Sequence, residues 1–68
     1  MWYVYICNRK GKLYTGITSN LGHRMKQHQA ELLYSEKFAD KYVAAKRERE
    51  IKVWRREKKL ALINKASG

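Results

Sequence analysis

Two side chains that could act on a phosphate lie four residues apart, Arg24 and His28. On a helix this spacing places them on one face, one turn from each other. An arginine can make two parallel hydrogen bonds to phosphoryl oxygens, which suits a charge that builds there during a reaction. His28 could donate to a leaving oxygen or shuttle a proton. From the spacing alone, a basic helix surface without chemistry is the commoner explanation.

Tyrosines are the second group of candidates. Tyr3, Tyr5 and Tyr14 occur in two short apolar segments, and Tyr3 and Tyr5 share a face if the first segment is a strand. Core packing with a hydroxyl at the edge is the usual reason for such residues. A phenol near a cation or a metal-bound water can instead act as a base, because its pKa falls there.

One carboxylate completes the candidate set. Glu48 follows Ala44 by four residues and precedes Ile51 by three, so on a helix it lies beside an apolar stripe. A hard divalent cation such as Mg²⁺ needs only one or two protein carboxylates, because water and substrate phosphate complete its shell. Glu48 is therefore a candidate metal ligand.

Hydrophobic patterning predicts the elements that must hold these residues. Residues 1–7 (MWYVYIC) and 13–18 (LYTGIT) are rich in aromatic and β-branched side chains, which predicts two strands joined by a polar turn at 8–12 (NRKGK). Gly11 suits a positive φ in that turn. Gly16 interrupts the second strand, which indicates a bulge or a close approach.

A helix is predicted from Leu21 to about Gln29, with capping side chains at residues 18–20 (TSN), and a third strand at 31–38 (ELLYSEKF). Next come a helix that Asp40 caps and that runs through about Val53, and a last helix over about 55–64.

In that last helix, Leu60 and Ile63 are expected to face inward. The order β-β-α-β-α-α indicates one α+β domain over residues 1–68, a small antiparallel three-stranded sheet flanked by helices.

The charge balance points to a polyanionic partner. The chain has 16 Lys and Arg against six Asp and Glu, a net charge of +10 on 68 residues. Nucleic acid is the commonest partner of such a field. A membrane surface is less well supported, because no long helix combines a wide apolar face with a basic one. Candidate nucleic-acid contacts are Arg24, Lys26, Lys46, Arg47, Lys52, Arg55 and Arg56.

Cys7 is the only cysteine and lies in an apolar run, so a reduced, buried thiol is expected, as in a cytoplasmic protein. A zinc site from Cys7, His23 and His28 is disfavoured, because their spacing matches no common ligand pattern. We expect no signal peptide and no membrane span, because the longest apolar stretch is too short.

These positions together resemble a known family. Residues 3–5 (YVY), and residues 14–16 (YTG) nine positions after Tyr5, resemble the two halves of the GIY-YIG nuclease motif. Arg24 and His28 fall where that family carries its helix arginine and histidine. Glu48, in the segment AAKRE, resembles the family's metal-binding glutamate. The resemblance covers most of the chain, which looks like the small stand-alone bacterial members.

The resemblance implies a DNA-directed endonuclease that uses one divalent ion, Mg²⁺ or Mn²⁺, held by Glu48. Arg24 would stabilise the charge on the phosphoryl group, and His28 would handle a proton or bind phosphate. Tyr5 or Tyr14 would position or deprotonate the attacking water, and the sequence does not choose between them.

Gly16 would leave room for the backbone to approach the site. We expect a preference for the structure of the DNA rather than its sequence, because the chain has no room for a further DNA-reading domain.

Two departures from the family pattern stand out. The first motif begins with tyrosine instead of glycine and has valine in place of isoleucine, which keeps the final Tyr5. The connection after His28 is short, since Gln29 and Ala30 lead directly into the third strand. A short connection favours exchange between protomers, which predicts a homodimer formed through the segment after Ala30.

Other functions remain open at this point. A non-catalytic nucleic-acid-binding module would keep the fold and the charge, and RNA could replace DNA as the partner. A small regulatory protein that docks on an acidic partner is a third reading. Metal dependence separates an enzyme from a binding module, and strong salt dependence of nucleic-acid binding separates that module from the third reading.

Overall fold

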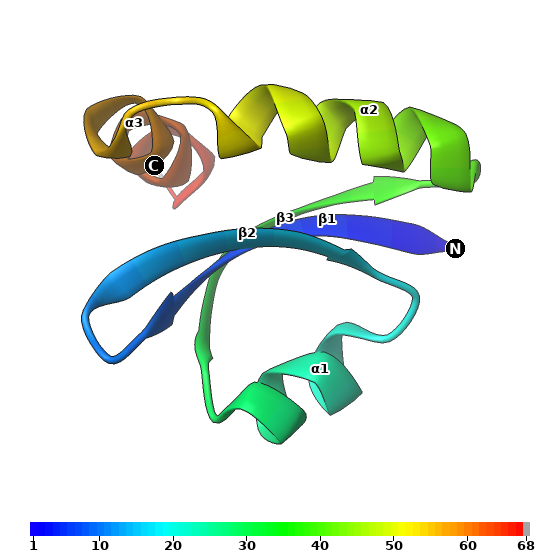
Figure 1. The fold of residues 1–68 in the computed structure, drawn as a ribbon, viewed down its shortest axis with the longest axis horizontal. Coiled ribbons are helices and arrows are strands. Elements are labelled where there is room, and N and C mark those ends of the chain that lie inside the picture. Colours follow the sequence, from blue (N-terminus) through cyan, green and yellow to red (C-terminus); the bar gives the residue numbers. More distant parts are fainter. Residues whose placement is uncertain (68) are drawn as a thin grey trace.

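The strands and helices follow in the predicted order, β-β-α-β-α-α. The computed structural model describes residues 1–67, with a three-stranded antiparallel sheet and helices on both of its faces (Figure 1). The sheet order is β2-β1-β3, so the first strand is central. The elements are β1 (Trp2–Arg9), β2 (Lys12–Thr18), α1 (Leu21–His28), β3 (Glu31–Phe38), α2 (Lys41–Lys52) and α3 (Arg56–Ser67).

The turn between β1 and β2 is tighter than the sequence predicts. Only Lys10 and Gly11 lie outside the strands, with φ of 52° and 81°. Two central residues with positive φ are typical of a type I′ turn, whose twist matches that of the flanking strands. The expected positive φ at Gly11 is confirmed.

Strand register divides the side chains of the hairpin between two faces. Tyr5 lies opposite Gly16, Cys7 opposite Tyr14, and Arg9 opposite Lys12. Directly opposite residues share a face of the sheet, and alternate residues along a strand share it too. We call this side, which also carries Tyr3, the tyrosine face.

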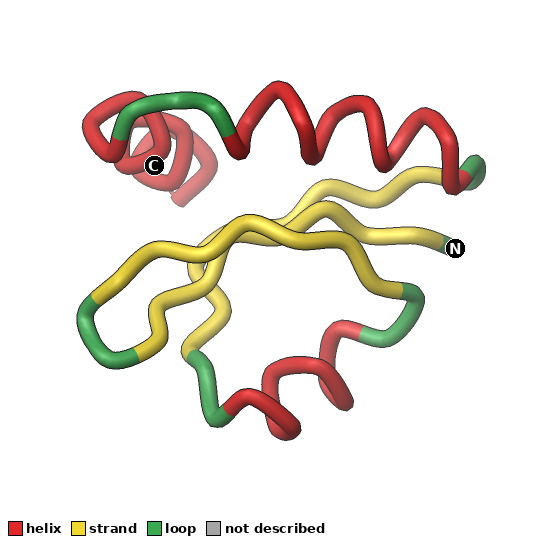
Figure 2. The backbone as a smooth tube through the Cα atoms, in the orientation of Figure 1, coloured by secondary structure: helices red, strands yellow, loops and turns green. Residues whose placement is uncertain are grey.

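The opposite side of the sheet carries the core. Val4 and Ile6 of β1 are fully buried against Ala44 and Ile51 of α2. Figure 2 shows α2 and α3 on this side and α1 on the other, so the sheet separates α1 from α2. The partly buried hydrophobic residues around the core are Trp2, Leu13, Ile17, Tyr34, Phe38, Trp54, Leu62 and Ile63.

One inward residue of α3 was predicted wrongly. Ile63 packs against the core as expected, but Leu60 is 36% exposed and Leu62 takes the inward place. The partly buried positions are Lys59, Leu62 and Ile63, which follow the three- and four-residue spacing of one helix face. Leu60 lies outside that face.

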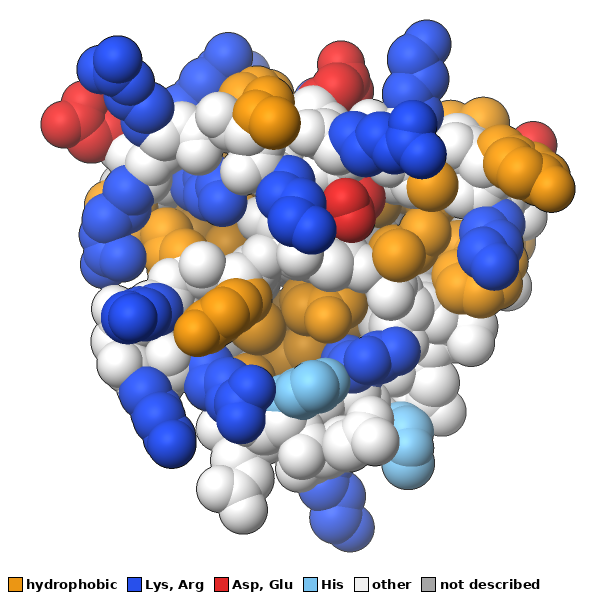
Figure 3. Space-filling model, in the orientation of Figure 1, with side chains coloured by type: hydrophobic (Ala, Val, Ile, Leu, Met, Phe, Trp, Pro, Cys, Tyr) orange, Lys and Arg blue, Asp and Glu red, His pale blue; other side chains and the backbone are white. Residues whose placement is uncertain are grey.

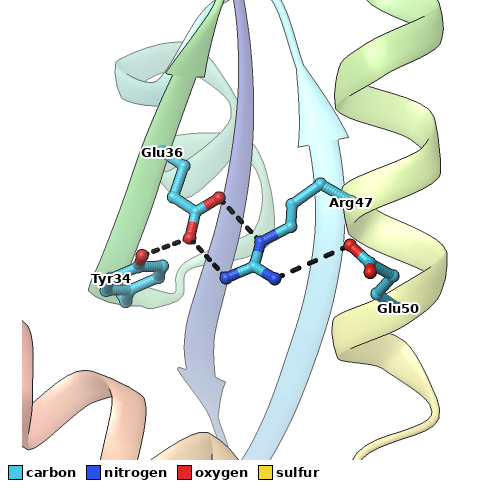
Figure 4. A network of polar contacts seen from close by, with 4 residues as sticks. All are labelled: Tyr34, Glu36, Arg47 and Glu50. Atoms are coloured by element: carbon cyan, nitrogen blue, oxygen red, sulfur yellow. Dashed lines mark hydrogen bonds and ion pairs between the residues drawn. The ribbon is translucent and has the colours of Figure 1, made fainter.

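A network of polar side chains joins α2 to β3 (Figure 4). Arg47 donates from Nε to Glu36 Oε1 at 2.9 Å and from Nη2 to Glu36 Oε2 at 3.0 Å. Its Nη1 lies 3.6 Å from Glu50 Oε1, and the Tyr34 hydroxyl donates to Glu36. The guanidinium also lies 5.2 Å from the centre of the Trp54 ring.

Arg47 is therefore occupied within the fold. Each of its three guanidinium nitrogens has a carboxylate partner, so its charge is paired within the fold, and its predicted phosphate contact stays a prediction. Burial alone would raise the pKa of Glu36, but hydrogen bonds from Arg47 and Tyr34, with the charge of Arg47, lower it.

The connection after α1 is short, as expected, and is closed by its own hydrogen bonds. Gln29 has φ of 52°, its N–H donates to Lys26 O, and the N–H of Ala30 donates to Met25 O. These are the bonds of a Schellman motif, which usually has glycine at the position of Gln29.

β3 then pairs with β1 of the same chain. The short connection thus does not prevent β3 from packing on its own chain, which was the premise for the predicted exchange between protomers. None of the helices within residues 1–67 is long and apolar enough to cross a membrane.

Candidate active site

Tyr5 lies at the centre of the candidate site, packed over Gly16. Its side chain is 8% exposed, and its backbone pairs with Gly16 on the neighbouring strand. A Cβ at position 16 would lie 2.5 Å from Tyr5 Oη and 2.7 Å from Cζ. The missing side chain of Gly16 therefore makes room for the phenol. The sequence predicted a close approach here, but by backbone rather than by Tyr5.

Two side chains of opposite charge act on this phenol from different helices. Burial raises the pKa of Tyr5, the positive charge of Arg24 on α1 opposes that shift, and Cys7, once ionised, and the negative charge of Glu48 add to it. Arg24 and Glu48 thus both lie near enough to Tyr5 to influence its ionisation. With a raised pKa, the phenol stays protonated at neutral pH.

α1 is fixed at both ends so that Arg24 is presented to the sheet. Asn20 caps the helix by accepting a hydrogen bond from the N–H of His23 at 3.0 Å, and Thr18 Oγ1 accepts one from the N–H of Asn20 at 3.1 Å. Residues 29 and 30 close the other end. The helix therefore begins and ends at defined residues, although none of its own side chains is fully buried.

Arg24 and His28 share one face of α1, as their spacing predicts. Arg24 Nη1 lies 3.4 Å from His28 Nε2, and both side chains are half-buried. Because arginine can only donate, His28 Nε2 is the acceptor and the ring proton is on Nδ1.

Glu48 is half-buried on α2, between Ala44 and Ile51, the two buried residues of that helix. It makes no hydrogen bond or ion pair with any other side chain in residues 1–67, although the chain carries 16 Lys and Arg. A carboxylate without a basic partner is free to bind a cation.

No group of three or more His, Cys, Asp or Glu side chains within the described residues could hold a metal ion. Glu48 could thus supply one protein carboxylate to Mg²⁺ or Mn²⁺, with waters and a substrate phosphate as the other ligands, a mode that magnesium commonly adopts. Cys7 is a free cysteine and is buried, as expected.

Tyr14 differs from Tyr5 in its surroundings. It lies on the tyrosine face opposite Cys7, and its side chain is 47% exposed. It makes no hydrogen bond with the other side chains of residues 1–67. Tyr14 can therefore reach a bound molecule directly, whereas Tyr5 is buried and packed over Gly16.

The predicted nucleic-acid contacts come from elements on opposite sides of the sheet. Arg24 and Lys26 lie on α1, on the tyrosine face, whereas the remainder lie on the other side of the sheet with α2 and α3. Those remaining exposed residues are Lys46, Lys52, Arg55 and Arg56.

Sequence reasoning missed Arg9 and Lys12, which are exposed at the end of the hairpin. Alternation along the two strands places both on the same face as Tyr5. The sequence alone could not show this shared face. The pairing of the two strands depends on the number of residues in the turn, which is two, and a turn of another length would change it.

Comparison with known proteins adds two kinds of similarity. Residues 1–32 match the GIY-YIG catalytic domain family, a segment that includes Tyr5, Tyr14, Arg24 and His28 but not Glu48. A UPF0213 protein of Staphylococcus saprophyticus is 38% identical, with 91% of this chain and 93% of that protein aligned. A UPF0213 protein of Oceanobacillus iheyensis is 40% identical over 90% of this chain and 87% of that protein.

The alignment with the staphylococcal protein extends over 76 positions, more than the 68 residues of this chain, so that relative has residues without a counterpart here. The solution NMR structure of a UPF0213 protein from Bacillus halodurans is similar with a TM-score of 0.67 and 32% identity. It covers 94% of this chain and 84% of the other. The similarity thus extends over the whole fold and well beyond the matched segment.

Proposed function

Because the chain belongs to the UPF0213 family of small GIY-YIG domain proteins, we propose that it is a metal-dependent endonuclease that hydrolyses phosphodiester bonds in DNA. The observation that carries the proposal is the half-buried carboxylate of Glu48, which has no basic partner in residues 1–67, in a fold that also holds Arg24 and His28 3.4 Å apart. A structure-directed choice of DNA is part of the proposal.

Arg24 stabilises the negative charge that develops on the phosphoryl oxygens. Its guanidinium is oriented by the capped helix and by its contact with His28, and its positive charge opposes the rise in the pKa of Tyr5. Preorganised positive charge at this point is usually the largest contribution to phosphoryl transfer. His28 orients Arg24 in the free protein and, with its ring proton on Nδ1, is available to handle a proton.

Glu48 holds the divalent ion, Mg²⁺ or Mn²⁺, which when bound polarises the phosphodiester and offsets its charge. Its carboxylate has no competing basic partner in residues 1–67, which supports this assignment. The same carboxylate contributes to the raised pKa of Tyr5, so we expect the substrate phosphate to bind near both groups.

The two tyrosines are assigned different roles. Tyr5 is buried with a raised pKa, so in the free protein it is a neutral hydroxyl that can donate to or orient a water. It becomes a base only when added positive charge lowers its pKa. Tyr14 is exposed and contacts the substrate.

The test is cleavage of labelled single-stranded, duplex, flapped and branched DNA, with single-stranded RNA, in Mg²⁺, Mn²⁺ or EDTA. We expect cutting of DNA that needs metal and falls at least 100-fold in Arg24→Ala and in Glu48→Gln. Lys65→Ala, which removes an exposed charge from α3, is the matched control and should cut like the original chain.

Cutting that persists in EDTA or in Glu48→Gln would contradict the metal role. Tight, salt-sensitive DNA binding without cutting in any metal would mean a non-catalytic nucleic-acid-binding module. Preference for RNA over every DNA would reassign the substrate.

The homodimer stays a prediction with a weaker basis, since β3 pairs with β1 of its own chain. Sedimentation at several concentrations tests it, and monomer at all of them would refute it.

A further inference from the structure

The end of the β1–β2 hairpin is a cluster of positive charge that the proposed reaction does not use. Arg9, Lys10 and Lys12 surround the turn, and all three are exposed. None of them makes a hydrogen bond or ion pair with another side chain in residues 1–67. We call these three residues the basic tip.

Acidic side chains are few around the basic tip, where Glu31 of β3, paired with Asn8, is the neighbouring carboxylate along the sheet. Residues 1–30, which form β1, β2 and α1, contain no Asp or Glu, and all six acidic residues occur from Glu31 onward. Figure 3 shows Lys and Arg side chains over the hairpin end, at the lower left, beside the hydrophobic area between β2 and α1. A polyanion approaching this end therefore meets three positive charges, with Glu31 as the nearest acidic residue along the paired strand.

Arg9 and Lys12 are in line with the candidate site. They lie on the tyrosine face, and the next pairs along the hairpin are Cys7 with Tyr14 and Tyr5 with Gly16. The positive charge of Arg9 acts on Cys7, where it opposes the rise in the pKa of the thiol that burial causes. Arg9 is thus close to the inner part of this face.

Lys10 occupies a turn position at which other residue types are favoured. Its φ of 52° lies in the left-handed region, where asparagine, aspartate and glycine are favoured in a type I′ turn. A lysine at this point adds charge to the tip at a conformational cost. Turn geometry alone does not explain that choice.

We propose that the basic tip grips the phosphate backbone of the DNA at a short distance from the bond that is cut. The inference rests on the proposed function and adds a second point of contact to it. Arg9 is four residues from Tyr5 along β1, which is about 14 Å at the usual rise of a strand. That length matches about four base pairs of B-form DNA. The tip then fixes the substrate's direction across the site.

The test measures binding in EDTA, so that the result does not depend on cutting. Fluorescence anisotropy gives the affinity for a labelled duplex at several KCl concentrations. The variants are Lys10→Asn and the double variant Arg9→Gln with Lys12→Gln, and Lys65→Gln on α3 is the matched control. Each lost phosphate contact should reduce the slope of log K against log salt by about 0.9.

We expect a reduction of about 0.9 for Lys10→Asn and about 1.8 for the double variant, with no change for the control. Lys10→Asn also creates the preferred Asn-Gly turn, so its unfolding midpoint should not fall. A loss of binding in a variant that is at least as stable cannot come from a damaged fold.

Slopes in both tip variants equal to that of the original chain would overturn the inference. If that chain cuts DNA all the same, the proposed function survives this result. If tip variants lose slope in a chain that never cuts, the tip inference stands and the proposed nuclease falls. No DNA binding by the original chain would overturn both.

Discussion

Tyr5 and Gly16 form a pair in which the absence of one side chain positions the other. The phenol occupies the space that any Cβ at position 16 would need. The sequence indicates a close approach at Gly16, because an interior glycine in a strand is unusual. It could not identify Tyr5 as the approaching group, since that depends on the register of the hairpin.

Gly16→Ala should push the Tyr5 phenol away from Arg24 and Glu48. We expect DNA cleavage to fall more than tenfold and the free energy of unfolding to drop by about 1–3 kcal/mol, the usual cost of overpacking. Gly22→Ala is the matched control, because its Cβ would meet only Asn20 Oδ1, at 3.8 Å, and should keep full activity. Equal cleavage by the two variants would contradict the described fit.

Tyr34 contributes to the free energy of unfolding, and this contribution is lost at alkaline pH. Burial, with the neighbouring Glu36, raises the pKa of Tyr34 from 10 to about 12. Because the folded state holds the proton more tightly, this contribution is complete below pH 10 and is lost between pH 10 and 12. The difference in unfolding free energy between the original chain and Tyr34→Phe should shrink over that interval in urea titrations. A constant difference would show that Tyr34 titrates alike in both states.

Arg47 shows why a residue's role could not be read from its charge. In the sequence it is one of nine basic residues between Lys41 and Lys59. Its partner Glu36 lies eleven residues away on another element, and the core packing of α2 brings the two together. Contacts of this kind depend on the packing of whole elements, so local patterns do not reveal them.

At the scale of elements, the sequence predicts order and type well. Aromatic and β-branched runs mark the strands, and Asn20 and Asp40 cap the helices that follow them. The ends are less well predicted, because a turn of two residues and a Schellman closure depend on single φ values. The same holds for the candidate site. The placement of Arg24 and His28 depends only on their helix, whereas that of Tyr5 and Glu48 depends on the strand register and on the packing of α2.

The Schellman motif at the end of α1 can be tested by substitution. Gln29 holds φ of 52° with a side chain that disfavours that conformation, so Gln29→Gly should stabilise the protein by about 1 kcal/mol. Gln27→Gly, inside the same helix, should destabilise it by about 1 kcal/mol. Thermal unfolding of the two variants measures both effects. Destabilisation by Gln29→Gly would mean that the side chain of Gln29 contributes more than its strain costs.

For the whole molecule, a net charge of +10 on 68 residues opposes folding through self-repulsion. Salt screens that repulsion, and it also weakens binding to DNA. The unfolding temperature should therefore rise between 50 and 500 mM KCl while DNA affinity falls. Calorimetry and anisotropy in the same buffers check the pair of trends. An unfolding temperature that falls with salt would mean that attractive ion pairs outweigh the repulsion.

The fully buried core residues belong to β1 and α2, whereas α1 contains no fully buried residue. Segments with few buried contacts open at lower free energy than the rest of a protein. Amide hydrogens of α1 should accordingly exchange with deuterated water sooner than those of β1. Since Arg24 and His28 both belong to α1, warming separates them from Tyr5 and Glu48 while the sheet is still intact. Loss of this arrangement on warming should then be a local event that precedes melting, and cooling should restore it without any need to refold the sheet.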